Sequence, residues 1–451
     1  MVVFGRTVFA LLFLGLGLLY FRAVTFMQKE PGTVSIGKLC LYLAGPWMIF
    51  LAGWPYVSPD VFYYLGKGWM ESGYGMDVFR QSLEDVPDLH DQPLFFNVHP
   101  AFWDNVGNYG PAFQILCAGV AWLGQGDIRL SLLIFKIVCA VALAVCGFYV
   151  YRLACVNNQP PAMAVFCLLA SPLILFSFLT CTHNDVFLAL GMLMALWRTH
   201  RRCPLSCGII LGTIFSIKYI SLMVTPLFGL YFLKDRIKPL RNAFMFSVAF
   251  LGSAILFHWF KPGSWDLVTD FAGKGYSTGR NSLTIFLLPF LQGFGVDEAF
   301  SLIKRTVQLA FFFWAPAVAL YWALAPRMNV LDLVRSMVAL YLFYLVLTAQ
   351  FVQEWYLIWV WPLAAVLPGS WSMNWMKGLG LFYMLGVIFT MGNPPLISLT
   401  AQAYLYAALV LVSVPWLCSR ELFPFSWGDV REQMAVMRKT VVGRSGGFGK
   451  V

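Results

Sequence analysis

The stretch LTCTHNDVFLAL, residues Leu179–Leu190, places three polar side chains in the middle of a long apolar region. His183, Asn184 and Asp185 stand together there, with leucine, phenylalanine and alanine dominant on both sides. A carboxylate at the centre of a bilayer costs about 3 kcal/mol or more. Either the chain leaves the membrane at this point, or the three residues serve a buried polar site. We expect that both interpretations are partly true.

The composition is typical of a helical membrane protein. The chain has 451 residues, of which 60% are hydrophobic and 12% are charged, and its mean hydropathy is +0.73. A soluble domain carries about twice that share of charged residues, so the soluble classes are excluded. Apolar runs of about 20 residues recur along the chain, and each is long enough to span a bilayer. The sequence therefore predicts an all-α polytopic membrane protein.

The basic residues fix the predicted orientation. The net charge of +10 does not indicate a nucleic-acid partner, because the basic residues cluster in short loops and in the C-terminal tail. The clusters at 198–203 and 234–241 and the tail after Arg420 are placed in the cytoplasm by the positive-inside rule. Arg152 precedes the apolar segment 160–179, so this segment rises from the cytoplasm and His183–Asp185 emerges on the outer side.

Alternation across the membrane predicts about 13 spans, with the N-terminus outside and the C-terminus inside. Residues 1–418 are predicted as one transmembrane domain and residues 419–451 as a basic cytoplasmic tail. Residues 56–128 are too polar to span and are predicted as a large external loop with interfacial helices. Residues 261–300 are predicted as a second external loop. The predicted spans are 7–26, 36–55, 129–151, 160–179, 186–199, 204–217, 219–233, 240–260, 302–324, 331–350, 355–369, 376–391 and 400–418.

Lys218 stands at the centre of an apolar stretch, residues 208–233. A single tilted helix would bury its ammonium group in hydrocarbon. The basic loops before and after this stretch are both cytoplasmic, so the number of crossings between them is even. We therefore predict two short helices that meet at Lys218 in a polar external cavity. There the ammonium group is expected to bind an anion, such as a phosphate.

The same topology places two aspartates on the outer side, and each has a structural and a functional interpretation. Asp60 follows Ser58-Pro59 and either caps a helix or acts as a general base that deprotonates a hydroxyl group. Asp185 either caps the descending helix with help from Asn184 or joins a hydrogen-bond network with Asp60 or an acceptor sugar.

Further candidates lie later in the chain. Arg280 is either a solvated loop charge or a part of the site. Gln353, Glu354 and Tyr356 lie in the segment QEWYLIWVWPL, which is either an aromatic belt at the membrane surface or a further part of the binding site. The glutamine and the glutamate are hard to explain as members of a belt.

No cofactor is expected from the sequence. The first loop contains VPDLHDQPLFFNVHPAFWDN, but the spacing of its acids and histidines fits no standard metal site. Solvated loop acids are the favoured interpretation, and a divalent metal is kept as the alternative. The tail sequence GRSGGFGK follows no predicted strand and opens no helix, so it is not a phosphate loop. The residues considered as metal ligands are Asp88, His90, Asp91, His99 and Asp104.

Five stretches occur in an order that resembles the GT-C superfamily of glycosyltransferases, and within it the bacterial mannosyltransferases that use polyprenyl-phosphate mannose. SPDVFYYLGKGWMESGYGMDVF is similar to the first-loop motif of that family, and NYGPAFQIL is similar to the segment that ends the loop. THNDVFLALGMLMAL is similar to the family's HND segment. LGTIFSIKYISLMVTP resembles a short helix pair with a lysine near the donor phosphate. QEWYLIWVWPL resembles a segment reading PWYLLW, with Glu354 in place of proline.

The resemblance implies an inverting transferase that moves a hexose, mannose by default, from a polyprenyl-phosphate donor to a hydroxyl group. It implies that Asp60 is the catalytic base and that Lys218 lies near the donor phosphate. A basic group there stabilises the charge that develops on the leaving phosphate. The acceptor is a glycan, a glycolipid or a protein. The donor's isoprenoid tail stays in the bilayer, and the reaction takes place on the outer face of the bacterial cytoplasmic membrane.

A secondary transporter or flippase for a lipid-linked or small polar substrate is the alternative function. Ionisable residues inside a membrane and a broken helix are also typical of secondary transport. The two halves of the sequence show no hydropathy repeat, and the large first loop has no counterpart, which favours the enzyme. An enzyme predicts that Asp60, Asp185 and Lys218 converge on an outer cavity. A transporter predicts that they line a path through the midplane.

Overall fold

The computed structural model describes most of the chain. It covers residues 2–270 except 31, 56–57 and 236; residues 298–380 except 326–327, 350–351, 368 and 370–371; and residues 399–424. Between 270 and 298 it covers 283, 287 and 291–293. The described residues form helices, turns and connecting segments and contain no strand, so the predicted all-α class is confirmed for them.

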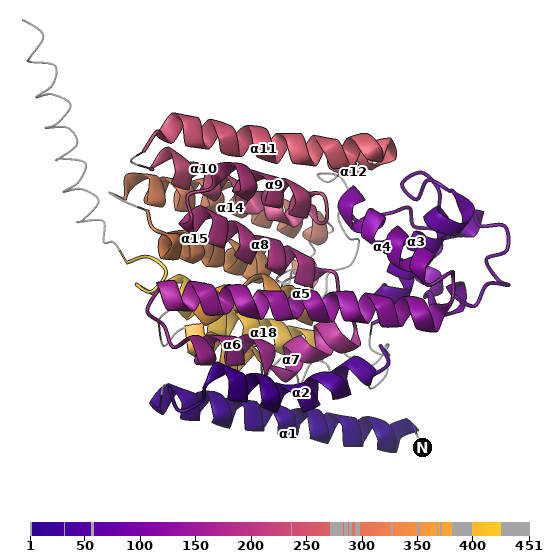
Figure 1. Cartoon of the computed structure of the whole chain (residues 1–451), viewed down its shortest axis with the longest axis horizontal. Helices are drawn as coiled ribbons and strands as arrows, with labels where there is room; N and C mark the ends of the chain where they lie inside the picture. The colour runs from indigo at the N-terminus through magenta and orange to yellow at the C-terminus, as the bar shows by residue number, and fades with distance from the viewer. Residues whose placement is uncertain are drawn as a thin grey trace, which may run out of the picture.

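Most helix axes lie roughly side by side in one bundle, and α3 and α4 lie outside it at one end (Figure 1). The first half of the bundle contains α1 (Val2–Lys29), α2 (Ile36–Ala52), α5 (Ile128–Val156), α6 (Pro161–Leu169), α7 (Pro172–Leu175), α8 (Asp185–His200), α9 (Pro204–Phe215), α10 (Thr225–Leu233) and α11 (Pro239–Phe260). The later helices are α12 (Trp265–Asp270), α14 (Ala299–Leu324), α15 (Val330–Phe343), α16 (Trp361–Val366) and α18 (Leu399–Leu417).

The bundle contains helices of membrane-spanning length. Among the described residues, five helices are long and apolar enough to cross a bilayer, or six if one bent pair counts as a single span. The longest is α5, whose 29 residues extend for about 43 Å at 1.5 Å per residue. The chain is thus a helical multi-pass membrane protein, while the number of about 13 spans stays a prediction. Part of the predicted span 376–391 lies outside the described residues.

The helix pair predicted around Lys218 is present. Helix α9 ends at Phe215, a 3-10 turn η5 (Tyr219–Met223) follows, and α10 begins at Thr225. Helix α9 runs parallel to α11, because Ser253 donates a hydrogen bond to Ile209 O and the rings of Phe215 and His258 lie 6.1 Å apart. Helix α10 runs back along α11.

The return of α10 is shown by two ring contacts. Tyr219 stacks on His258 near the end of α11, and Phe232 contacts Phe246 near its middle, with ring centroids 5.6 Å apart. Helices α9 and α10 therefore form a hairpin with Lys218 at its tip. This confirms the predicted pair of short helices that meet at Lys218, while the external position of the tip stays a prediction.

The segment 160–179 is not the single straight span that we predicted. Helix α6 ends at Leu169, and the next helical piece runs from Pro172 to Thr180 at an angle of 50° to it. Pro172 has no N–H group to donate and disfavours helical backbone at Ser171, which explains the break. The second piece ends in a π-helical turn, η4 (Phe176–Thr180).

The predicted span 355–369 is also wrong as a continuous helix. A 3-10 helix, η8 (Glu354–Trp359), is followed by the six-residue α16, which has Pro362 in its first turn. Neither piece is long enough to cross about 30 Å of hydrocarbon. A second π-helical turn, η7 (Tyr344–Thr348), ends α15 just before this segment. Such turns occur frequently at functional sites.

The first loop forms a cap at one end of the bundle, which is also the end where α1 begins (Figure 1). It contains α3 (Asp60–Tyr74), α4 (Pro111–Leu123) and three 3-10 turns, η1 (Leu83–Asp85), η2 (Phe95–Asn97) and η3 (Pro100–Phe102). Helix α4 exposes Ile115, Trp122 and Leu123, as an interfacial helix would. Helix α3 differs from the prediction, because its residues 61–68 are all buried by protein.

Candidate active site

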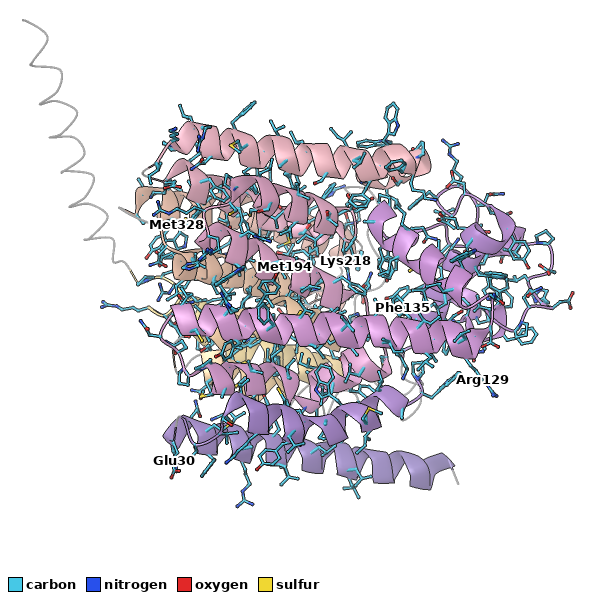
Figure 2. All side chains as sticks on the ribbon, in the orientation of Figure 1. Glu30, Arg129, Phe135, Met194, Lys218 and Met328 are labelled. Carbon is cyan, nitrogen blue, oxygen red and sulfur yellow. The ribbon has the colours of Figure 1, made fainter. Side chains whose placement is uncertain are left out.

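The starts of three helices and the turn of one helix hairpin lie together where the first loop joins the bundle. Helix α3 begins at Asp60, α8 begins at Asp185, the α9–α10 hairpin turns at Lys218, and η8 begins at Glu354. Figure 2 shows Lys218 at this end of the bundle, close to the α3–α4 cap. Thr182, just before the start of α8, has a φ of 55°, which is rare for a β-branched residue. Strained backbone of this kind is concentrated at functional sites.

Asp60 and His183 form the first pair of the site. Asp60 Oδ2 lies 3.6 Å from His183 Nδ1, and 21% of the aspartate side chain is exposed while the histidine is fully buried. The imidazole stacks on Trp355, with ring centroids 3.6 Å apart and planes 13° apart. The N-cap position of α3 is Pro59 and Asp60 is the first residue of the helix, which does not favour the alternative in which Asp60 is the N-cap residue. The carboxylate thus lies next to a buried imidazole on one side and is partly exposed to solvent.

Asp185 and Lys218 form the second pair. Lys218 Nζ lies 2.7 Å from Asp185 Oδ1, and the same oxygen accepts a hydrogen bond of 2.6 Å from Trp359 Nε1. The aspartate is fully buried, whereas 18% of the lysine side chain is exposed. Asp185 is the first residue of α8, but its carboxylate faces a lysine and a tryptophan and is not bonded to the backbone of that helix. The predicted proximity of Asp185 to Lys218 is therefore observed.

Aromatic rings surround the Lys218 ammonium group. Its nitrogen lies 4.8 Å from the ring centre of Tyr356, 5.4 Å from that of Trp359 and 6.0 Å from that of Tyr109. Contacts between a cation and aromatic faces are favourable, and more so where water is excluded. Tyr356 and Trp359 also stack on each other, with centroids 4.6 Å apart. The cage fixes the position of the positive charge and leaves it partly open.

Several polar atoms of the HND segment have no hydrogen-bond partner in the described part of the chain. They are both ring nitrogens of His183, both amide atoms of Asn184 and Oδ2 of Asp185. Asn184 is 1% exposed, and the other two side chains are completely buried. Buried polar groups in proteins are almost always bonded, so such a cluster marks a place for water or a ligand.

The structure describes three of the four remaining predicted site residues. Gln353 and Glu354 are buried, with exposures of 3% and 6%, at the start of η8 beside Trp355. Tyr356 is part of the lysine cage. Arg280 lies outside the described residues. The structure thus brings Asp60, His183, Asn184, Asp185, Lys218, Gln353, Glu354 and Tyr356 to the same end of the bundle.

The NYGP segment joins the first loop to the Lys218 hairpin. Gly110 N donates a 3.0 Å hydrogen bond to Ile217 O, and Ala112 N donates one of 2.8 Å to Ser216 O. A Cβ atom on Gly110 would lie 2.2 Å from Ser216 O, so no other residue allows this approach of the two backbones. The position of Lys218 therefore depends on a contact with the end of the first loop.

Gly110→Ala is expected to destabilise the protein by about 1–3 kcal/mol, the usual effect of forcing extra atoms into a packed site. It should also slow the reaction at the site, because the hairpin that carries Lys218 must move. Thermal unfolding in detergent measures the first effect. The matched control is Gly119→Ala in α4, where a Cβ atom meets nothing within 4 Å. An unfolding temperature for Gly110→Ala equal to that of the control contradicts this account.

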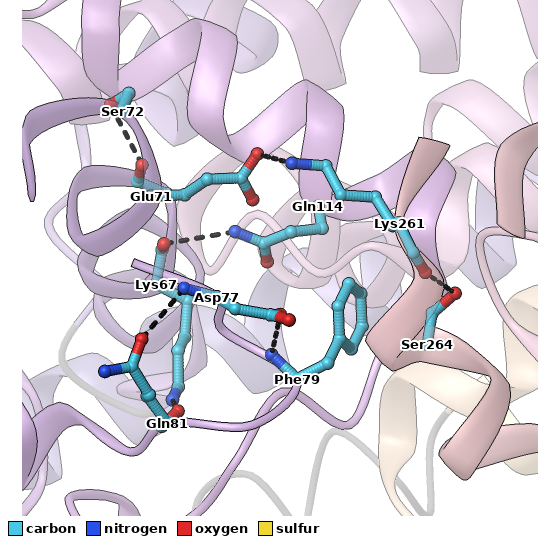
Figure 3. A network of polar contacts seen from close by, with 10 residues as sticks. Lys67, Glu71, Ser72, Asp77, Phe79, Gln81, Gln114, Lys261 and Ser264 are labelled. Atoms are coloured by element: carbon cyan, nitrogen blue, oxygen red, sulfur yellow. Dashed lines mark hydrogen bonds and ion pairs between the residues drawn. The ribbon is translucent and has the colours of Figure 1, made fainter. Parts of the chain in front are cut away.

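A second polar network holds the first loop against the end of α11 (Figure 3). Glu71 of α3 forms an ion pair with Lys261, which follows α11. Gln114 of α4 donates a 3.1 Å hydrogen bond to Lys67 O. Lys67 Nζ donates to Gln81 O at 3.1 Å, and burial lowers the pKa of this lysine to about 8. The network ties α3 both to α4 and to the beginning of the second predicted external loop.

Three of the five acids and histidines considered as metal ligands have other contacts. Asp88 accepts hydrogen bonds from the hydroxyl of Tyr74 and from Gln92 Nε2. His99 accepts one from Ala101 N, and His90 packs edge-on against Trp103. Asp91 and Asp104 are exposed. Within the described residues, no three histidine, cysteine or acidic side chains are grouped as a metal site would require.

Three aromatic residues of the site were not singled out from the sequence. They are Tyr109, Trp355 and Trp359, and all lie in stretches that the resemblance had already marked. Trp359 follows Trp355 by four positions, yet one contacts His183 and the other Asp185. The only available signal was the concentration of tryptophan and tyrosine beside Gln353 and Glu354, which equally fits a membrane belt.

Comparison with known proteins finds a family that matches the first half of the chain. Residues 2–234 match a family described as alpha-(1->6)-mannopyranosyltransferase, N-terminal domain. This is just over half of the 451 residues and includes Asp60, the HND segment and Lys218. The alpha-(1->6)-mannopyranosyltransferase A of Corynebacterium glutamicum is 24% identical over 182 residues, which cover 40% of this chain and 36% of that protein. The chain therefore belongs to the alpha-(1->6)-mannopyranosyltransferase family.

Proposed function

We propose that the chain is an inverting mannosyltransferase that moves mannose from a polyprenyl-phosphate donor to a hydroxyl group of a mannose-containing acceptor. The observation that carries the proposal is the convergence of the Asp60–His183 and Asp185–Lys218 pairs around buried, unsatisfied polar groups. Family membership supports the transferase chemistry. The name of the corynebacterial relative supports the primary 6-hydroxyl of a mannose residue as the acceptor group.

Asp60 supplies the base in this mechanism. Its carboxylate is partly exposed, so an acceptor hydroxyl group can reach it, and the buried His183 lies 3.6 Å from it on the protein side. Removal of the hydroxyl proton as the new bond forms makes the oxygen a stronger nucleophile. The oxygen attacks the anomeric carbon of mannose on the face opposite the phosphate. The bond to the phosphate oxygen breaks in the same step, so the anomeric configuration inverts.

Lys218 stabilises the leaving phosphate. An ammonium group has three N–H donors, and Asp185 uses one of them. In the proposal the exposed side of the lysine binds the phosphodiester, while Asp185 and the aromatic cage hold the nitrogen in place. Arg280 is retained as a second candidate for this charge. Stabilisation of developing negative charge by fixed positive groups is usually the largest single contribution to such catalysis.

The unsatisfied atoms of His183 and Asn184 provide contacts for sugar hydroxyl groups. The Asn184 amide has both donors and an acceptor without partners, which matches a hydroxyl group that also donates and accepts. No nucleotide is needed, since the phosphodiester bond of the donor carries the energy of the transfer. The apolar tail of the donor remains in the bilayer beside the spans.

The site is proposed to face the outside of a bacterial cytoplasmic membrane. A reporter fused at Gly75 in the first loop is expected to give an external signal. Reporters fused after Arg202 and at the C-terminus are expected to give a cytoplasmic signal, as the basic clusters predict. An external C-terminus would mean that the number of spans is wrong by one, and the face on which Asp60 and Asp185 lie would have to be determined again.

The proposed function is tested with radiolabelled polyprenyl-phosphate mannose. Membranes that contain the protein are incubated with this donor and with a membrane extract as the source of acceptor, and the labelled product is identified. Label in a glycan or glycolipid, absent from membranes without the protein, is the expected result. Movement of unreacted donor across the membrane without transfer contradicts the proposal and supports the flippase alternative. The convergence of the charged residues at one end of the bundle favours the transferase.

A further inference from the structure

Lys136 is a buried lysine in the membrane-spanning helix α5, and it has no role in the proposed mechanism. Its side chain is 4% exposed. Its nitrogen donates a 2.8 Å hydrogen bond to Leu51 O and a second bond to Gly53 O. A charged side chain inside a span is costly, and those that occur have a specific role. The position of its partners indicates what that role is.

The two partners are carbonyl groups at the end of α2. The last carbonyl groups of a helix have no partner within the helix, and the helix end carries a partial negative charge. Ile49 O and Phe50 O both accept from Gly53 N, and Phe50 O also accepts a 2.8 Å hydrogen bond from Thr180 Oγ1. Lys136 donates to two further carbonyl groups at this end, those of Leu51 and Gly53. A lysine from one span thus caps the C-terminal end of another.

The capped end is also packed against the segment that leads to His183. A Cβ atom on Gly53 would lie 3.1 Å from Thr180 Cγ2, so the end of α2 packs closely against the Thr180 side chain. Thr180 is the last residue of the π-helical turn η4. Lys136, Gly53 and Thr180 therefore form a joint between α5, α2 and η4.

Both segments that build the base of the site leave from this joint. Asp60 follows Gly53 by seven positions, and His183 follows Thr180 by three. Their side chains meet again 3.6 Å apart. Because both links are short, we expect a shift of the end of α2 relative to η4 to change the distance between Asp60 and His183.

We propose that Lys136 is a positioning residue, which sets the place of Asp60 opposite His183 by fixing the end of α2 against α5 and η4. This inference rests on the proposed function of Asp60. Because a positioning residue acts through Asp60 and not through the substrates, the replacement of Lys136 should lower kcat and leave the KM for the sugar donor unchanged. A misplacement of about 1 Å can slow a reaction roughly a hundredfold.

The test uses the full-length protein in lipid vesicles with polyprenyl-phosphate mannose. Lys136→Met keeps the length of the side chain and removes the hydrogen-bond donors, and a fall in kcat of roughly tenfold or more is expected. Lys136→Arg keeps a cation with N–H donors and should restore part of the rate. The matched control is Lys234→Met. Lys234 caps the end of α14 through Trp322 O, Ala323 O and Ala325 O, so its loss should lower stability and leave kcat unchanged.

A double-mutant cycle separates positioning from a general loss of stability. If Lys136 acts through Asp60, the variant Lys136→Met/Asp60→Asn should react as slowly as Asp60→Asn alone, because residues that act as a unit are not additive. Thr180→Val, which removes the other side-chain bond to α2, should show the same behaviour with a smaller effect. It also provides the test if Lys136→Met does not fold.

Independent, additive effects on kcat, or equal losses for Lys136→Met and Lys234→Met, would overturn the inference. The failure of the inference differs from the failure of the proposed function. If Asp60→Asn is slow and Lys136→Met has the wild-type rate, the positioning role alone is wrong. If Asp60→Asn itself reacts at the wild-type rate, the proposed function of Asp60 is wrong.

Discussion

Asp60→Asn is expected to slow mannosyl transfer by roughly a hundredfold or more, the usual cost of losing a general base. The substitution keeps the size of the side chain and can still accept a hydrogen bond, but it cannot take up the proton of the acceptor hydroxyl group. The variant should insert into the membrane and unfold at nearly the wild-type temperature. Transfer rates of the purified proteins with labelled donor provide the measurement.

The matched control for Asp60→Asn is Glu84→Gln. Glu84 is an exposed acid in the η1 turn of the same loop, so the charge change is equal and the site is untouched. Its transfer rate should match that of the wild type. A wild-type rate for Asp60→Asn removes Asp60 from the mechanism, whatever the stability of the protein.

Lys218→Met is expected to have the second large effect, on both stability and rate. It leaves the fully buried Asp185 with Trp359 as its remaining hydrogen-bond donor, and breaking a buried ion pair costs about 3 kcal/mol or more. The rate should fall by roughly a hundredfold or more, because the leaving phosphate loses a fixed positive charge. Thermal unfolding and the transfer rate are measured on the same preparation.

The double variant Lys218→Met/Asp185→Asn distinguishes the two roles of the lysine. It removes both charges, so much of the lost stability should return. The rate should stay low, because the phosphate still lacks its partner. A return of the rate together with the stability would show that Lys218 only balances the charge of Asp185.

The candidate site could be predicted from the sequence where a single residue conflicts with its surroundings. Lys218 and Asp185 are costly in an apolar segment, and this cost predicted the helix hairpin and the polar site before any contact was known. Asp60 was found through its motif. The same reasoning missed Lys136, because one lysine hardly changes the hydropathy of a 29-residue helix whose other residues are mostly apolar.

The contacts between distant segments could not be predicted. Trp359 and Asp185 are 174 positions apart in the chain, and nothing in either segment specifies the other. The predictions of continuous spans at 160–179 and 355–369 were wrong for a local reason. A hydropathy average over a window does not take into account that proline has no backbone N–H group. Pro172 and Pro362 interrupt helical hydrogen bonding at single positions for this reason.

The configuration of the new glycosidic bond tests the central claim most directly. Purified protein in vesicles is given polyprenyl-phosphate mannose and a synthetic mannoside acceptor, and the anomeric configuration of the product is determined by NMR and compared with that of the donor. A single displacement with Asp60 as base predicts complete inversion. A product that retains the configuration of the donor requires two displacements through a glycosyl intermediate, and would contradict the account.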